Sequence, residues 1–80
     1  MDIHKLVVMA NSIGAFFASM PDAHEARLGI AQHLEKFWAP RMRETFLGAL
    51  DDETTATLHP LVRAAVIEHR ASLERKKAAV

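Results

Sequence analysis

The 80-residue sequence contains no cysteine and no tyrosine, and it has only three glycines, three prolines and one tryptophan. Without cysteine the chain cannot form disulfides, use a thiolate nucleophile or ligate an iron–sulfur cluster or a cysteine-type zinc ion. Neither glycine-rich phosphate-binding pattern, Gly-x-Gly-x-x-Gly or Gly-x-x-x-x-Gly-Lys, occurs. Runs of β-branched residues alternating with period two are also missing, so nothing in the sequence predicts a strand.

The chain also lacks an excess of charge. Ten basic and ten acidic residues give a formal net charge of zero. Three basic and four acidic residues in the first forty give −1, and seven basic and six acidic residues in the last forty give +1. Because nucleic-acid binding depends on a basic surface, this balance argues against a nucleic-acid partner.

A long hydrophobic run is missing as well. The uncharged stretch from Leu6 to Met20 has 15 residues, whereas a membrane-spanning helix needs about 20. Asn11 and Ser12 interrupt this stretch, Asp2 offsets the early lysine, and no good signal-peptidase site follows. We therefore expect a cytoplasmic protein that does not cross a membrane.

The small size of the chain has an energetic consequence. A domain of this length buries only about 60% of its unfolded surface, and its own core supplies about 3–5 kcal/mol. With no disulfide and no evident metal site, a partner chain is the remaining route to stability. These considerations favour a subunit over an enzyme that acts alone.

Proline residues divide the sequence into four predicted helices. The first covers about residues 2–18, with apolar residues spaced by three and four. We expect Ser19 to begin the second helix as its N-cap, with Asp22 three residues later in a capping-box position. That helix ends near Trp38, because Pro40 disfavours helical geometry in the residue before it.

The second half of the chain continues the helical pattern. A third, shorter helix is predicted over about residues 40–50, the acidic segment 51–55 forms a loop, and Pro60 begins the fourth helix. We predict an all-α fold, a small compact bundle of about four helices. The predicted domain spans residues 1–71 and is followed by a charged C-terminal tail, residues 72–80.

Five histidines are many for 80 residues, but their spacing does not suggest a metal site. None has another histidine, aspartate or glutamate three or four residues away, so no pair of ligands lies on one helix face. We expect them to be surface or capping residues and predict no metal, cofactor-binding or catalytic residue in this chain. The histidines are His4, His24, His33, His59 and His69.

The first predicted helix is apolar nearly all round, which is unusual for a surface helix. Small residues recur every four positions at Ala10, Gly14 and Ala18 and allow another helix to approach closely. One interpretation is that this face serves only the internal core. The interpretation we favour is a surface that binds a partner and causes self-association when the chain is isolated.

A second notable feature is the corner between the second and third helices. The lone Trp38 precedes Pro40 and the two arginines Arg41 and Arg43. Either Trp38 closes the end of the core and the arginines are solvated, or all three contact a partner, because Trp and Arg are frequent interface anchors.

Most of the chain, from about residue 3 to 69, resembles the delta subunit of soluble NAD-dependent formate dehydrogenases. The opening segment Leu-Val-Val-Met-Ala-Asn-Ser-Ile-Gly-Ala-Phe-Phe at 6–17 is similar to the first family motif. Residues 29–34, Gly-Ile-Ala-Gln-His-Leu, and 37–43, Phe-Trp-Ala-Pro-Arg-Met-Arg, resemble the central one. Residues 58–66, Leu-His-Pro-Leu-Val-Arg-Ala-Ala-Val, resemble the closing motif, and residues 72–80 match none.

The resemblance implies a non-catalytic accessory subunit of a cytoplasmic enzyme that oxidises formate to carbon dioxide and reduces NAD+. It implies that other subunits hold a bis-pterin molybdenum or tungsten cofactor, iron–sulfur clusters and FMN, and that this chain binds the catalytic alpha subunit and stabilises or assembles the complex. Two alternatives remain: a transient assembly factor for the apo-enzyme or its cofactor, and an unrelated homo-oligomeric helical interaction protein. The candidate partner-binding residues are Ala10, Asn11, Gly14, Phe17, Phe37, Trp38, Arg41, Arg43 and Arg63.

Overall fold

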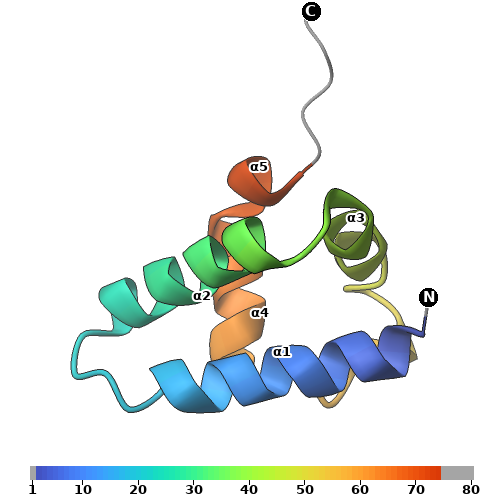
Figure 1. The fold of residues 1–80 in the computed structure, drawn as a ribbon. Helices are drawn as coiled ribbons and strands as arrows, with labels where there is room; N and C mark the ends of the chain where they lie inside the picture. The colour runs from blue at the N-terminus through green and yellow to red at the C-terminus, as the bar shows by residue number, and fades with distance from the viewer. Residues whose placement is uncertain (1, 75–80) are drawn as a thin grey trace, which may run out of the picture.

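A computed structural model describes residues 2–74, and every regular element in this part of the chain is helical (Figure 1). This confirms the predicted all-α class. Four longer helices are accompanied by a 3₁₀ turn, η1, and a short final helix, α5. The elements are α1 (Ile3–Phe17), α2 (Ala23–Phe37), α3 (Pro40–Gly48), η1 (Glu53–Thr55), α4 (Pro60–Glu68) and α5 (Arg70–Leu73).

The helices α1 and α2 run in opposite directions on either side of a short turn, and α4 lies across both of them (Figure 1). Helix α4 packs most extensively against α2, while α3 and α5 pack on each other and on the same two-helix layer. Within residues 2–74, no helix combines the length and the hydrophobicity that a bilayer crossing requires. Helices α1 and α2, with 15 residues each, are the longest helices of this part of the chain.

The helix starts follow directly from local sequence. Pro40 and Pro60 occupy the first turns of α3 and α4, where the missing N–H costs nothing. The expectation that Ser19 caps α2 is wrong. The cap is Asp22, whose carboxylate accepts from the His24 and Glu25 amides, whereas the Ser19 hydroxyl donates back to a carbonyl of α1. Asp22 follows Pro21 and directly precedes α2. Because its backbone is extended, as in other N-cap residues, its carboxylate reaches the first free amides of the helix.

The core lies between the α1–α2 layer and the helices that cover it. Its largest fully buried side chains come from every long helix except α1 and from the short α5. Leu73 of α5 is among them, so the packing extends to the end of the described residues; of the tail predicted over 72–80, residues 75–80 lie outside them. The apolar side chains in question are Phe46, Ile30, Leu34, Leu73, Val62 and Val66.

Candidate interaction surface

The small residues of α1 are used for packing inside the chain. Ala10 is fully buried, and a Cβ added to Gly14 would lie only 2.6 Å from the Val62 Cγ2 atom of α4. The close approach that these residues permit is therefore made by α4 of the same molecule. The structure thus places Ala10 and Gly14 in the internal core, the first of the two interpretations, while Ala18 is exposed.

Asn11, another candidate contact residue, is also bound within the chain. Its Oδ1 accepts the His59 amide at 2.7 Å, and its Nδ2 donates to the Thr57 carbonyl at 3.0 Å. Both bonds fix α1 against the segment that leads into α4. The polar interruption in the apolar first helix is therefore a structural link.

Arg63 of α4 organises the loop that precedes its helix. Its Nη1 donates to the Leu50 carbonyl at 2.9 Å and its Nη2 to the Thr55 carbonyl at 2.7 Å. The fully buried Thr55 hydroxyl lies within 3.0 Å of the Ala49 carbonyl and 2.8 Å of the Asp52 carbonyl. Arg63 and Thr55 together close the ends of α3 and η1, and the sequence analysis had not singled out Thr55.

The corner at Trp38 faces inward. The Trp38 side chain is 5% exposed, and its ring meets that of Phe46 edge-on with centroids 5.4 Å apart. Arg43 donates to the carbonyls of Leu73 at 2.9 Å and Trp38 at 2.8 Å, so it ties the end of α2 to the end of α5. Trp38 closes the core, as one interpretation proposed, but Arg43 is not the solvated residue that this interpretation assumed. Arg41 is exposed.

Four ring side chains form a continuous row across α1 and α2, which we call the aromatic strip: Phe16, Phe17, His33 and Phe37. The Phe16 and Phe17 rings meet edge-on at 5.1 Å, Phe17 lies 6.4 Å from His33, and His33 lies 4.8 Å from Phe37. Both ends of the strip are open, because Phe16 is 73% and Phe37 69% exposed. Of the predicted contact residues, the exposed Phe37 and the half-buried Phe17, which also packs against the core, thus belong to this strip.

A groove of about 430 Å³ runs along this strip, between α1 and α2. It is lined by Ser12, Ile13 and three members of the strip, and none of these residues carries a formal charge apart from the titratable His33. Gly29 allows the helices to be close here, since a Cβ at that position would lie 2.5 Å from the Phe17 ring. The groove is therefore a shallow apolar feature built by both helices.

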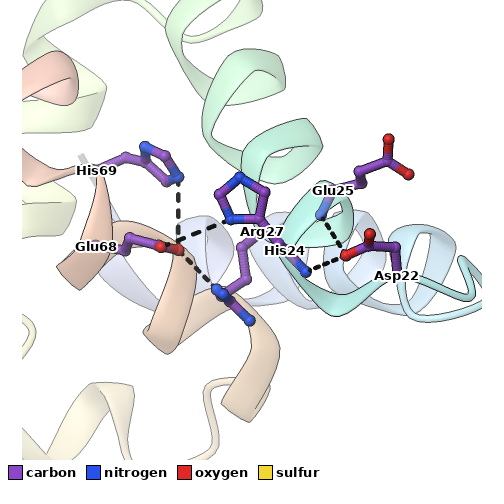
Figure 2. Close-up of polar contacts among 6 residues, drawn as sticks. All are labelled: Asp22, His24, Glu25, Arg27, Glu68 and His69. Carbon is purple, nitrogen blue, oxygen red and sulfur yellow. Dashed lines mark hydrogen bonds and ion pairs between the residues drawn. The ribbon is translucent and has the colours of Figure 1, made fainter.

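Charged side chains gather at a different place, where the start of α2 meets the end of α4 (Figure 2). Glu68 accepts from Arg27 Nε at 2.6 Å and has His69 Nε2 at 3.6 Å and His24 Nδ1 at 3.9 Å. The hydrogen bond from Arg27 lowers the pKa of Glu68 below its ordinary value, and the charge of Arg27 adds to this effect. In residues 2–74 no three His, Cys, Asp or Glu side chains are arranged to hold a metal ion. This cluster joins two helices.

Sequence reasoning missed Phe16 as a member of the aromatic strip, and it expected His33 only as one of the surface or capping histidines, whereas the structure places His33 half-buried within the strip. The available signal was helical geometry: Phe16 follows the buried Gly14 by two positions, about 200° around the helix, and so lies opposite the face that packs on α4. His33 could not be assigned in this way, because its position depends on the approach of the two helices at Gly29.

The family model described as NADH-dependent formate dehydrogenase delta subunit FdsD matches residues 5–66. This range contains the aromatic strip and all nine candidate contact residues. No curated protein and no solved structure matches the chain.

Proposed function

The chain belongs to the family of NADH-dependent formate dehydrogenase delta subunits, and we propose that it acts as a non-catalytic subunit that binds the catalytic alpha subunit and stabilises or assembles the complex. The observation that carries this proposal is the family match over most of the chain. A subunit of such an enzyme belongs to a complex with other chains, and a chain of 80 residues gains stability from one.

The hydrogen bonds of three residues in the family-like motifs support a non-catalytic role. The side chains of Asn11, Arg43 and Arg63 form hydrogen bonds with backbone carbonyls and amides of this chain. The charged cluster at Glu68 links α2 to α4, and its Arg27, which donates to Glu68, also lines an open groove of about 460 Å³. These hydrogen bonds are all made within the chain, which agrees with a structural role.

The cofactors of the reaction are best assigned to other subunits. A chain without cysteine offers no thiolate to an iron–sulfur cluster, and the titratable side chains of residues 2–74 provide no metal-ligand set. We therefore assign the bis-pterin metal centre, the iron–sulfur clusters and FMN to the other subunits. We derive no step of formate oxidation from this chain.

The proposal is tested by removing the chain from cells that make the complete enzyme. We expect less assembled enzyme and less formate-dependent NAD+ reduction per cell, while the rate per assembled alpha subunit stays unchanged. Normal yield and activity without the chain would refute the proposal. A lowered rate per assembled enzyme would instead indicate a direct part in catalysis.

The same strains separate a lasting subunit from a transient assembly factor. If the chain is a subunit, active enzyme purified from complemented cells contains it in a fixed ratio to the alpha subunit. If it is a transient factor, cells require it for assembly, but the purified active enzyme lacks it.

A further inference from the structure

We propose that this chain binds the rest of its complex through the aromatic strip. The element bound there is an amphipathic helix of another subunit, which lies in the groove between α1 and α2. This inference rests on the proposed function and adds the surface and the kind of element that it receives. It starts from the most exposed aromatic side chains, Phe16 and Phe37, which lie at the two ends of one connected row.

The shape of the surface favours a helix. The groove lies where the two long helices α1 and α2 meet: four of its lining residues come from α1, and His33 comes from α2. A helix laid between two others places large side chains into such a groove at intervals of three or four residues. Phe16 lines the groove, and the Phe37 ring packs on His33 beside it, so both exposed rings can contact the incoming helix.

The chemistry of the surface specifies the contacting face of that helix. Ser12 is the only hydroxyl-bearing residue that lines the groove, and its hydroxyl already donates to the Val8 carbonyl at 3.3 Å. Arginine, lysine, aspartate and glutamate are all missing from the lining. The remaining polar side chain of the lining is the His33 ring, whose Nδ1 is buried and has no hydrogen-bond partner. The incoming face should therefore be predominantly apolar, because a carboxylate or ammonium group buried there would meet no residue of opposite formal charge in the lining.

The area of the strip argues against a second copy of this chain as the occupant. A fully exposed aromatic side chain offers about 150–250 Å², so Phe16 and Phe37 at 73% and 69% exposure present roughly 200–350 Å² together. A stable dimer of two equal partners buries about 800 Å² on each. The strip has the size of an anchor within a larger contact, as a family of enzyme subunits requires.

Other occupants fit less well. A membrane surface calls for lysine and arginine around the apolar residues, and the groove lining has neither. A small ligand calls for several convergent polar groups in an enclosed site, whereas this groove is shallow. The ring-to-ring contacts along the strip hold the exposed phenylalanines in place, which lowers the entropy lost on binding.

The test uses the full chain, tagged and co-expressed with the complete enzyme. Its measurement is the ratio of tagged chain to alpha subunit after a high-salt wash. The variant Phe16→Ser/Phe37→Ser should lower this ratio at least tenfold. The control Ile67→Ser removes an apolar side chain of similar exposure, 61%, from α4 and should be retained as well as wild type. Circular dichroism and urea unfolding of each isolated variant report its fold, and Phe37→Ser alone replaces the double variant if that one unfolds.

A photo-crosslinking phenylalanine analogue at position 16 identifies the occupant. We expect it to join the chain to a helical segment of another subunit. Crosslinking to a second copy of this chain, or equal retention of the strip variants and Ile67→Ser, would overturn the inference while leaving the proposed function in place. Failure of the wild-type chain itself to co-purify would overturn both.

Discussion

Asn11 holds the backbone at His59: its side-chain oxygen accepts the His59 amide at 2.7 Å, across 48 positions of sequence. His59 in turn caps α4, since its Nδ1 accepts the Leu61 amide at 3.1 Å. The first helix of the chain thereby sets the position at which the last long helix begins. The polar residue within the apolar α1 has a structural role that its sequence context alone does not reveal.

Replacing Asn11 with alanine should therefore destabilise the fold. The change leaves the part-buried His59 amide without its acceptor and frees the Thr57 carbonyl, which should cost about 1–3 kcal/mol. Urea unfolding of the isolated chain measures this loss. Ser12→Ala is the matched control, because the Ser12 hydroxyl bonds only within its own helix, and its effect should stay within about 0.5 kcal/mol. Equal effects of the two substitutions would contradict the proposed link.

The two arginines after Pro40 should behave differently. Arg43→Ala removes donors from the carbonyls of Trp38 and Leu73, and hydrogen bonds to a charged group contribute about 1.5–3 kcal/mol each. Arg41→Ala alters an exposed side chain at the start of α3 and should change stability by less than about 0.5 kcal/mol. Thermal unfolding followed by circular dichroism compares the two variants. A loss of stability in Arg41→Ala as large as that in Arg43→Ala would show that the bridge to α5 contributes little.

Alanine substitutions at two glycines should have opposite effects on stability. At Gly14 a new methyl group meets Val62 at 2.6 Å, and the short, branched valine cannot move its methyl aside. Gly14→Ala should therefore destabilise by about 1–3 kcal/mol despite the better helix propensity of alanine. Gly48→Ala meets no atom within 4 Å and should be neutral or stabilise by up to about 1 kcal/mol. Chemical denaturation of both variants checks the prediction, which fails if Gly14→Ala is as stable as wild type.

The Arg27–Glu68 pair predicts a dependence of stability on pH. The pKa of Glu68 is lowered in the folded chain, chiefly by the hydrogen bond from Arg27. The ionised carboxylate therefore stabilises the folded state above the ordinary pKa of glutamate, and this contribution is lost as the pH falls through the lowered folded value. The stability difference between wild type and Glu68→Gln should thus be present at neutral pH, disappear in acid and shrink with added salt. A difference that persists unchanged at the acid end would contradict this assignment.

The positions of the prolines made the starts of two helices predictable. Pro40 and Pro60 mark the starts of α3 and α4 by local sterics alone. The prediction that Ser19 caps α2 was wrong. The helix begins only after Pro21, so the residue directly before its first free amides is Asp22. The separation of α5 from α4 at His69 was not predicted either, since the apolar pattern continues through that position.

The candidate site was less predictable, for a definite physical reason. Sequence periodicity identifies residues on one helix face, but it does not say which neighbour covers that face. The spacing of Ala10 and Gly14 predicted a face that binds a partner, but in the structure both residues are buried and α4 packs on Gly14. Trp38 likewise had two interpretations that only its contact with Phe46 distinguishes. Phe37 was identified because it belongs to a recognisable motif, and its exposure makes it a contact candidate still.

The most direct test of the central claim is the composition of the active enzyme. Size-exclusion chromatography of the complex, purified through a tag on another subunit, gives the ratio of this chain to the alpha subunit across the peak of formate-dependent NAD+ reduction. We predict a constant ratio across that peak, with the chain co-eluting at high salt, because salt does not weaken an apolar contact such as the one proposed for the aromatic strip. An active peak that lacks the chain, with the chain eluting alone, would contradict the claim that it is a lasting subunit of the complex.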